Sequence, residues 1–236
     1  MQDRFIHTRD DVLDLLDDLL ADKDGSWWDG FFTNRAKPIP FFVDWPDENL
    51  REWFDQGRLQ PGRVLELGSG HGRNAVFLAG RGCTVEAVDF SAEAIAWARE
   101  LAAKADVEID FQHRDILDLD LEPGAYDLIY DSGCFHHLAP HRRPDYVDLV
   151  RRALKPGGHL GQVCFRPEGG SGLTSDRQVY EQRTLGGGLG YGENQLRALW
   201  DDEPFSVEVL RAMANQDGEP SFGADFLWAL LVAKAG

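Results

Sequence analysis

The chain has few cysteines and no long hydrophobic run, and both scarcities limit what kind of protein it can be. Only three cysteines occur in 236 residues, at Cys83, Cys134 and Cys164, each among apolar or small neighbours. A small, odd and scattered set predicts buried free thiols in a reducing compartment, not a disulfide framework. No apolar stretch approaches the roughly 20 residues that a membrane-spanning helix needs. The first residues also lack the layout of a signal peptide, so we expect a cytoplasmic protein with no membrane partner.

Positive charge is scarce as well. The chain carries 24 basic against 41 acidic residues, a formal net charge of −17. Such a surface repels phosphate backbones, which argues against DNA or RNA as a partner. An acidic excess is also a common means of keeping a protein in solution, so it does not identify a partner. With 43% hydrophobic and 28% charged residues, the composition predicts one sizeable globular domain.

The most informative stretch reads RVLELGSGHG and begins at residue 63. The apolar run at 64–67 predicts a buried strand, and three glycines follow it at alternate positions, Gly68, Gly70 and Gly72. A helical pattern opens at Arg73. A strand that passes through a glycine turn into a helix lets a ligand approach backbone N–H groups closely. The alternative is an ordinary tight turn between a strand and a helix.

From residue 63 onward, predicted strands and helices alternate, which indicates an α/β fold with a doubly wound, mostly parallel sheet. The expected strands are residues 64–67, 84–89, 109–113, 126–131, 159–165, 206–212 and 226–233. The last two follow one another directly, which predicts an antiparallel pair at one sheet edge. We expect a single domain over residues 1–236, with a helical and aromatic cap segment at 1–60 and a cofactor-binding core at 61–236.

Three segments lie outside the alternating pattern, and two of them, the aromatic one and the glycine-rich one, are candidates for enclosing a site. Residues 9–22 have leucines on one helical stripe and aspartates opposite, which predicts an amphipathic helix. Residues 27–46 are rich in aromatic rings and broken by prolines, which is typical either of a loop pinned to the core or of a lid over a ligand. Residues 166–192 are rich in glycine and lack apolar periodicity, so we expect a long mobile segment there.

Polar residues follow several of the predicted parallel strands. In an open parallel sheet, ligands bind beyond the carboxyl ends of the strands. Asp89 closes one strand and could accept hydrogen bonds from both hydroxyls of a ribose, and Phe90 after it suits one face of adenine. Asp115 could accept the adenine amino group, with Ile116 beside it as an apolar flank. Asp131 closes another strand, at the expected mouth of the site.

Two adjacent histidines, His136 and His137, follow that last strand within the segment SGCFHHL. Histidine titrates near neutrality and so suits the deprotonation of a hydroxyl or an amine. The alternative for each is a packing or capping role. His137 and His141 are four residues apart and could share a helix face, but no third ligand stands at a matching spacing. We therefore predict no metal site.

The pattern E-x-G-x-G-x-G, beginning at Glu66, resembles the first motif of the class I S-adenosylmethionine-dependent methyltransferases. The dinucleotide fingerprint G-x-G-x-x-G does not fit, because Arg73 occupies its third glycine position. The later stretches YDLIYD and LKPGG are similar to further motifs of the same family. The resemblance implies a seven-stranded, Rossmann-like methyltransferase fold with S-adenosylmethionine as cofactor.

Carried over by position, the resemblance assigns the cofactor turn to Glu66, Gly68, Ser69 and Gly70. It likewise implies that Asp89 is the ribose acceptor and that Asp115 and Ile116 contact adenine, and strand-end carboxylates such as Asp131 could satisfy the cofactor's ammonium group.

The predicted cofactor-binding residues are therefore Glu66, Gly68, Ser69, Gly70, Asp89, Phe90, Asp115, Ile116 and Asp131. The predicted catalytic residues are His136 and His137.

The implied activity is transfer of a methyl group to a small-molecule acceptor. The proline-bearing aromatic segment ahead of the glycine turn is similar to the branch that contains thiopurine, halide and chalcogen methyltransferases. The D/N-P-P-Y-type motif of nucleic-acid amino-methyltransferases is missing, since DSGC stands at residues 131–134. Two other functions stay open: a non-catalytic protein that binds S-adenosylmethionine or S-adenosylhomocysteine, and a nucleotide-dependent oxidoreductase, which Arg73 disfavours.

Overall fold

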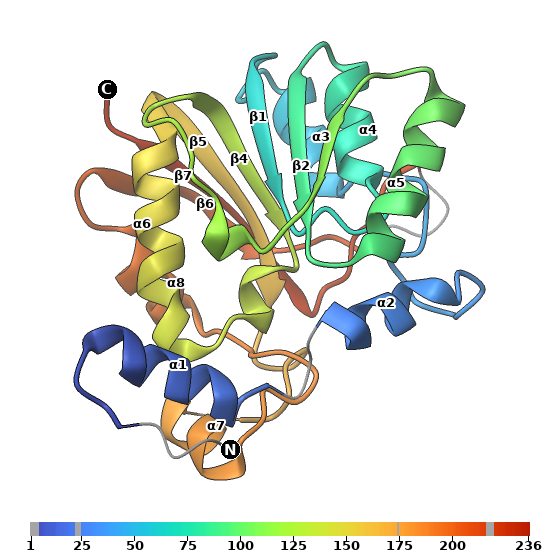
Figure 1. The fold of residues 1–236 in the computed structure, drawn as a ribbon. Helices are drawn as coiled ribbons and strands as arrows, with labels where there is room; N and C mark the ends of the chain where they lie inside the picture. The colour runs from blue at the N-terminus through green and yellow to red at the C-terminus, as the bar shows by residue number, and fades with distance from the viewer. Residues whose placement is uncertain (1–4, 22–24, 174, 216–219) are drawn as a thin grey trace.

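The computed structural model describes residues 5–21, 25–173, 175–215 and 220–236. Within these ranges seven strands form one sheet in the order β3-β2-β1-β4-β5-β7-β6, with helices on both faces (Figure 1). The strands are β1 (Arg63–Leu67), β2 (Thr84–Asp89), β3 (Asp110–His113), β4 (Tyr126–Ser132), β5 (Leu154–Phe165), β6 (Phe205–Ala212) and β7 (Leu227–Lys234). The predicted doubly wound, Rossmann-like sheet is confirmed.

Strand direction also follows the prediction. The first five strands run parallel to one another, and β7 lies antiparallel between β5 and β6. The β6–β7 pair therefore forms one antiparallel edge of the sheet. In the centre, Leu67 at the end of β1 lies in register with Val88 of β2 and Asp131 of β4. Because these strands are parallel, their carboxyl ends meet at one edge, where the side chains that follow them gather.

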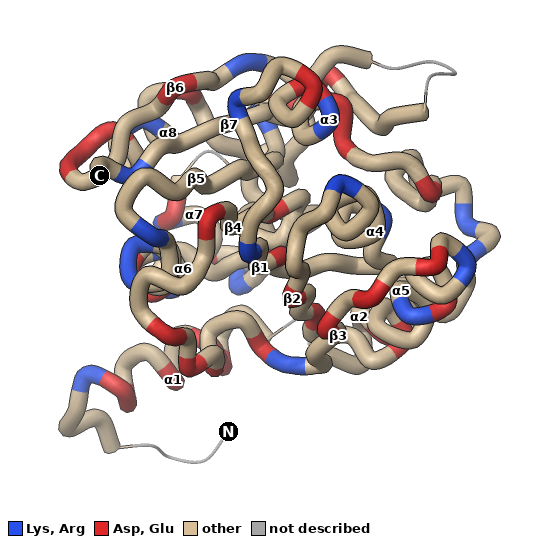
Figure 2. The backbone as a smooth tube through the Cα atoms, turned by 90° about the horizontal axis from the view of Figure 1, so that it is seen from above, with Lys and Arg blue, Asp and Glu red and all other residues tan. Residues whose placement is uncertain are grey.

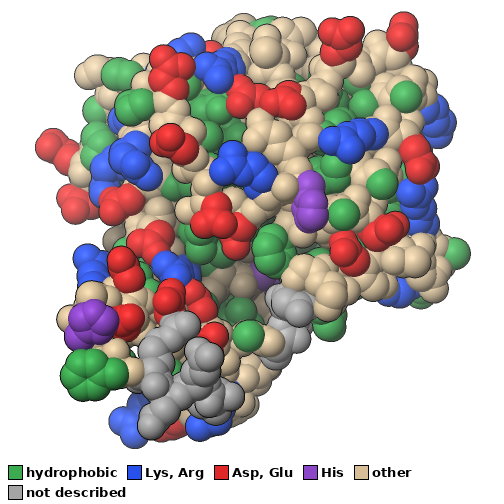
Figure 3. Space-filling model, in the orientation of Figure 1, with side chains coloured by type: hydrophobic (Ala, Val, Ile, Leu, Met, Phe, Trp, Pro, Cys, Tyr) green, Lys and Arg blue, Asp and Glu red, His purple; other side chains and the backbone are tan. Residues whose placement is uncertain are grey.

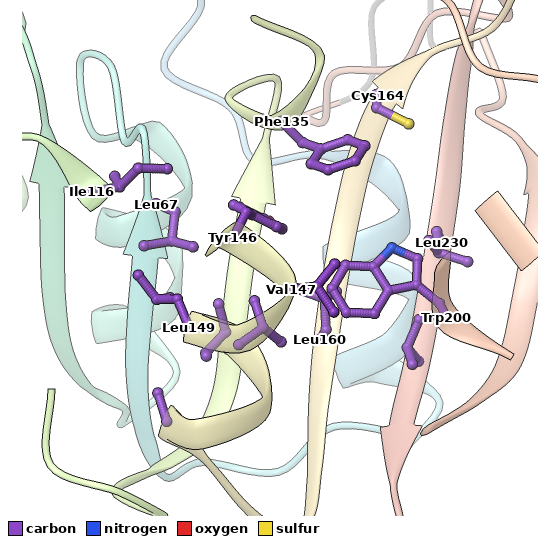
Figure 4. Close-up of a cluster of buried hydrophobic side chains, with 14 of the residues drawn as sticks. Leu67, Ile116, Phe135, Tyr146, Val147, Leu149, Leu160, Cys164, Trp200 and Leu230 are labelled. Carbon is purple, nitrogen blue, oxygen red and sulfur yellow. The ribbon is translucent and has the colours of Figure 1, made fainter. Parts of the chain in front are cut away.

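The helices form a layer on each face of the sheet. Buried side chains of α3 (Glu48–Asp55), α4 (Arg73–Gly80) and α5 (Ala92–Ala105) pack on one face. Those of α6 (Arg143–Ala153) and α8 (Glu193–Trp200) pack on the other, where Figure 4 shows Val147 and Trp200 beside Leu160. These apolar contacts between helices and strands supply most of the favourable free energy of such a fold.

Three further helices lie at the carboxyl end of the sheet (Figure 1). The amphipathic helix predicted at 9–22 is α1 (Arg9–Leu19), and the aromatic stretch begins with α2 (Gly25–Thr33). The glycine-rich segment contains α7 (Asp176–Gln182), which its lack of periodicity did not predict. Residues 22 and 174 of these predicted segments lie outside the described residues.

The glycine-rich segment is also tied to the sheet through its backbone. The N–H of Leu189 donates to the carbonyl of His136 at 2.7 Å, and the N–H of Tyr191 donates to the carbonyl of Phe165 at 2.9 Å. Pairing with residues distant in the sequence thus gives this segment regular contacts that its missing apolar periodicity did not indicate, and its mobility stays a prediction.

Across the described residues, Lys and Arg are interspersed with Asp and Glu along the backbone (Figure 2). None of the helices in the described ranges is long and apolar enough to cross a membrane. The absence of a nucleic-acid partner stays a prediction.

A buried ion pair fixes the beginning of α3 against α4. Asp47, fully buried, accepts hydrogen bonds from the Arg73 guanidinium at 2.6 Å, from the Asn74 amide at 3.0 Å and from the Tyr130 hydroxyl at 2.8 Å. The backbone N–H of Asp47 donates in turn to the Asn74 side chain at 2.8 Å. Three hydrogen bonds and the paired guanidinium compensate the buried carboxylate, but neither member of the pair can be removed alone without leaving a buried charge.

We therefore predict that Asp47→Ala lowers the free energy of unfolding by about 3–5 kcal/mol, because Arg73 would stay buried without its carboxylate. The measurement is urea unfolding followed by circular dichroism. The matched control is Asp55→Ala at the other end of α3, where the partly exposed pair with Arg81 should contribute less than about 1 kcal/mol. Similar losses in both variants would contradict the prediction.

Candidate functional site

The glycine turn after β1 lies at the centre of the carboxyl edge. Gly68 and Gly70 both have positive φ angles, 65° and 55°, which L side chains rarely adopt. A Cβ atom on Gly68 would lie 2.6 Å from the Cβ of Cys134, in the turn after β4. A Cβ atom on Gly70 would lie 3.4 Å from the ring of Phe32 in α2. Glycine is therefore required by backbone conformation at both positions and by close packing at Gly68.

Asp89, at the end of β2, holds this turn in place. One of its carboxylate oxygens accepts the N–H of Gly70 at 2.7 Å, and the other accepts the N–H of Ser91 at 2.8 Å. The side chain is largely buried, and this burial raises the pKa of Asp89 to about 6, although the two N–H donors oppose the shift. Each oxygen keeps a second acceptor position, so Asp89 can bind a diol while it supports the turn.

The residues predicted to surround adenine follow the ends of the neighbouring strands β2 and β3, where Asp89 pairs with His113. One oxygen of Asp115 accepts the N–H of Leu117 at 2.9 Å, where the 3₁₀ helix η1 (Ile116–Asp118) begins. Burial raises the pKa of the Asp115 carboxyl, and its other oxygen stays available as an acceptor. Ile116 is buried, while Phe90 is 43% exposed and lies against Gly25 at the beginning of α2.

Two buried oxygens beside the glycine turn lack hydrogen-bond partners among the described residues. They are Oε2 of Glu66 and Oγ of Ser69. Burial raises the pKa of Glu66 to about 8, and the nearby Arg73 only partly offsets the effect. Unsatisfied buried acceptors are rare in proteins and are typical of a site that completes its hydrogen bonds with a ligand.

Asp131 is placed differently from the prediction. Its carboxylate does not face the mouth of the site but is fully buried, and it accepts the Tyr146 hydroxyl at 2.8 Å and the N–H of Cys134 at 2.8 Å. Burial raises the pKa of Asp131 to about 7. The turn that follows β4 folds back over the carboxylate, so Asp131 supports this turn from beneath and does not contact the cleft.

The two histidines have different environments. His136 is buried, its ring is stacked on Phe165 with ring centroids 3.8 Å apart, and its Nδ1 accepts the N–H of Phe165 at 3.2 Å. This environment corresponds to the packing role that was the alternative to a catalytic role for His136. His137 is partly exposed, and its ring lies edge to face with Trp28 of α2 at 4.8 Å. Of the pair, His137 is the one that the fold leaves accessible to a ligand.

Helix α2 covers the site from the ribose end to the histidine end. Asp29 accepts a hydrogen bond from the Ser91 hydroxyl at 2.7 Å, Phe32 lies over Gly70, and Trp28 lies on His137. Beside this end of the sheet, the surface is hollowed next to the lobe that holds α1 and α7, with hydrophobic side chains and part of a histidine inside the hollow (Figure 3). These contacts place part of the aromatic segment over the predicted site, and its role as a lid stays a prediction.

The sequence did not single out Trp28 and Phe32 as individual site residues. Their spacing of four, which places two rings on one helix face, was the available signal. His141, considered above as a metal ligand, instead contacts Asp17 of α1 at 2.8 Å and the hydroxyl of Tyr180 at 2.9 Å. Among the described residues, no group of three or more His, Cys, Asp or Glu is placed to hold a metal ion.

A separate depression of about 500 Å³ lies between η1 and α6, lined by Leu117, Leu119, Leu149 and Arg152 among others. It contains none of the predicted site residues. The strand-end cleft, where the glycine turn and the polar side chains meet, is therefore the stronger candidate.

The buried Glu66 carboxyl makes stability depend on pH. Its raised pKa means that the folded state binds a proton more tightly than the unfolded state, so stability falls as pH rises from about 4.5 to 8. We predict that wild type loses on the order of 1 kcal/mol per pH unit in this range relative to Glu66→Gln. Urea unfolding at pH 6 and pH 9 measures the difference. The exposed Glu108→Gln serves as control, and parallel curves for all three proteins would contradict the prediction.

Comparisons with known proteins agree with this geometry. A family model described as a methyltransferase domain matches residues 64–158, from β1 into β5. The chain is 30% identical over 131 residues to a 2-heptyl-1-hydroxyquinolin-4(1H)-one methyltransferase of Mycobacteroides abscessus. This alignment covers 55% of this chain and 57% of the relative. It is 34% identical over 129 residues to a demethylmenaquinone methyltransferase of Thermus thermophilus, and this alignment covers 53% of this chain and 57% of the relative. The chain thus spans little more than half the length of these relatives.

Solved structures show the same fold over more of the chain. A structure reported for the conversion of a disulfide bond into a thioacetal group during echinomycin biosynthesis has a TM-score of 0.69 at 21% identity, covering 89% of this chain and 91% of its own. The 1,6-didemethyltoxoflavin-N1-methyltransferase of Burkholderia thailandensis, solved with S-adenosylhomocysteine, has a TM-score of 0.59 at 18% identity and covers 100% and 94%. Residues 64–158 therefore match a methyltransferase domain, the named relatives of this part of the chain are methyltransferases, and the solved structures share its fold.

Proposed function

We propose that this protein transfers a methyl group from S-adenosylmethionine to a small-molecule nucleophile. The observation that carries the proposal is that Asp89 and Gly70, joined by a hydrogen bond at the carboxyl edge, lie under a helix that also contacts His137. One cleft therefore combines a glycine turn, an acceptor for a diol and an accessible base. Only Asp131, among the predicted cofactor residues, is left out of this assignment.

The residues around the turn fit S-adenosylmethionine. The cofactor carries a cationic ammonium and a sulfonium, and Oε2 of Glu66 and Oγ of Ser69 are buried acceptors without partners among the described residues. A carbonyl of the turn, such as that of Gly68, is a further acceptor for the ammonium. Glycine at Gly70 keeps the turn free of a side chain, so its backbone can lie close to a ligand.

The nucleoside half would be held by the ends of two neighbouring strands. Asp89 would accept both ribose hydroxyls, with charge-assisted bonds that are stronger than neutral ones. The available oxygen of Asp115 would accept the adenine amino group, while Ile116 and Phe90 would flank the base. These roles require Asp89 to be ionised, which its pKa of about 6 allows at neutral pH.

The chain's contribution to the reaction is positioning, exclusion of water and, for some acceptors, removal of a proton. When bound, S-adenosylmethionine supplies an electrophilic methyl carbon that an in-line nucleophile displaces from sulfur. Helix α2 covers the cleft, which excludes water and restricts the orientations open to the acceptor. His137 would take the proton of a hydroxyl or amine acceptor. A thiolate or halide acceptor carries no such proton and would need no base.

Two features favour an acceptor that contains an aromatic or quinone-like ring. The accessible base His137 lies against Trp28 and near Phe165, so rings line this end of the cleft. Relatives are named for a hydroxyquinolone, a demethylmenaquinone and ubiquinone biosynthesis. The resemblance to the thiopurine, halide and chalcogen branch stays a prediction.

The test is formation of S-adenosylhomocysteine from S-adenosylmethionine with a panel of 1-hydroxyquinolin-4(1H)-ones, hydroquinones, phenols, amines, thiols and iodide. The proposal predicts turnover of at least one class, with the ring-bearing hydroxyl compounds first. Tight cofactor binding without turnover of any class would instead favour a non-catalytic cofactor-binding protein.

For the ribose contact, we predict that Asp89→Ala weakens binding of S-adenosylhomocysteine by about 2–4 kcal/mol, because two charge-assisted hydrogen bonds are lost. Isothermal titration calorimetry measures the dissociation constant. Asp110→Ala, at the opposite end of the neighbouring strand β3, should bind like wild type. Unchanged affinity in a folded Asp89→Ala protein would remove this residue from the site.

For the base, we predict that His137→Ala lowers kcat by about 10²–10⁴-fold with a hydroxyl or amine acceptor while affinity for S-adenosylhomocysteine holds. His159→Ala, at the other end of the sheet, is the control and should retain wild-type kcat. With a thiol or iodide acceptor, both variants should keep most of their activity. A wild-type rate with a hydroxyl acceptor that is flat from about pH 6 to 9 would exclude His137 as the base.

A further inference from the structure

Four fully buried polar side chains from four different elements form a continuous chain of hydrogen bonds. They are Trp200 of α8, Gln162 of β5, Tyr146 of α6 and Asp131 of β4. The indole N–H of Trp200 lies 3.2 Å from Oε1 of Gln162, and Nε2 of Gln162 lies 3.3 Å from the Tyr146 hydroxyl. That hydroxyl lies 2.8 Å from Oδ2 of Asp131. Figure 4 shows Tyr146 and Trp200 in the layer between α6 and the sheet.

The direction of every bond in this chain is fixed. An indole N–H can only donate, so the Gln162 carbonyl must accept it, which turns the amide NH₂ group toward Tyr146. The Tyr146 oxygen accepts that N–H, and its own hydrogen then points to Asp131. All three donors are therefore aligned toward one carboxylate, an arrangement in which each bond strengthens the next.

The carboxylate at the end of this chain supports the turn that carries the histidines. Asp131 accepts the N–H of Cys134 at 2.8 Å and the N–H of Phe135 at 3.0 Å, where the 3₁₀ helix η2 (Phe135–His137) begins. Ser132, Gly133, Cys134 and His137 of this turn are partly exposed, whereas the carboxylate beneath them is fully buried. The position of the turn thus depends on the orientation of Asp131, which the Tyr146 hydroxyl fixes from the other side.

Stability alone does not explain the presence of such a chain. Well-packed apolar residues in place of a buried polar network are often neutral or stabilising. The Tyr146 ring already packs on Phe135 and Trp200, with ring centroids 5.1 and 6.2 Å away, so a phenylalanine would keep these contacts. What the hydroxyl adds is a fixed direction for the Asp131 carboxylate.

We propose that Tyr146, acting through Asp131, is a positioning residue for the turn at 132–137, and that Gln162 and Trp200 fix its hydroxyl in place. The functional consequence rests on the proposed function, because it assumes that this turn contacts the methyl acceptor. The positioning itself does not depend on that assumption and can be measured without turnover.

The variant that tests the proposal is Tyr146→Phe, which removes only the hydroxyl. The protein offers a closely matched control in Tyr126, at the beginning of the same strand β4 that carries Asp131 near its end. Tyr126 is also buried, and its hydroxyl donates to Glu86 at 2.9 Å, so Tyr126→Phe likewise deletes one hydrogen bond to a carboxylate. It does so at the end of the sheet away from the turn.

The first readout is the set of ring ¹H–¹³C resonances of His136 and His137 in the protein without added ligand. We expect Tyr146→Phe to shift or broaden these resonances and Tyr126→Phe to leave them at their wild-type positions. Affinity for S-adenosylhomocysteine should stay within about twofold in Tyr126→Phe, whose hydroxyl lies at the end of the sheet away from the glycine turn. With an acceptor identified in the panel above, Tyr146→Phe should lower kcat about 10-fold and Tyr126→Phe less than about twofold.

Should Tyr146→Phe fail to fold, Gln162→Met tests the same chain, because it frees the Tyr146 hydroxyl from one of its two partners. It should shift the histidine resonances in the same direction by a smaller amount. Histidine resonances that match wild type in the folded variant would overturn the proposal. If no acceptor in the panel is turned over by wild type, the proposed function fails, while the resonances still decide whether Tyr146 positions the turn.

Discussion

The Asp89 carboxylate joins the two strand ends on which the site is built. It accepts the N–H of Gly70 after β1 and that of Ser91 at the beginning of α5. The Ser91 hydroxyl then donates to Asp29 of α2, so the covering helix is anchored to the same place. The shape of the glycine turn, the acceptor for a diol and the position of α2 therefore all depend on one buried carboxylate and the residues it holds.

The burial of three carboxyl groups is the second constraint on this site. Glu66, Asp89 and Asp131 lie buried at the carboxyl edge, and burial raises their pKa values to about 8, 6 and 7. In a chain of net charge −17, this placement disfavours the ionised forms further. A cofactor that carries an ammonium and a sulfonium would lower the free-energy cost of keeping Glu66 and Asp89 ionised. The proposed ligand thus accounts for the buried Glu66 carboxyl, whose Oε2 has no hydrogen-bond partner among the described residues.

The sequence predicted those features that depend on local pattern. The alternation of strand and helix patterns predicted the sheet, and the glycines at 68, 70 and 72 predicted the turn. The position of Asp89 at a strand end predicted that its carboxylate lies beside that turn. Ser91 caps the beginning of α5, where its hydroxyl accepts the N–H of Ala94. Each of these signals lies within a few residues of the structure that it specifies.

The predictions that failed depend on contacts between distant parts of the chain. Asp131 was expected at the mouth of the site, but Tyr146, fifteen residues later, draws its carboxylate into the core. His136 could not be told from His137 until the stacking on Phe165 was visible. Likewise, α7 forms in a glycine-rich segment whose backbone pairs with residues near His136 and Phe165. Periodicity within a segment carries no information about such partners.

The most direct test of the central claim is calorimetric titration of the wild-type protein with S-adenosylhomocysteine and, separately, with NADH, both at pH 7.5. If the glycine turn, Asp89 and Asp115 form a site for S-adenosylmethionine, S-adenosylhomocysteine should bind saturably at one site per chain, and NADH should give no saturable heat. Binding of NADH in preference to S-adenosylhomocysteine, or no binding of either by the folded protein, would contradict the account.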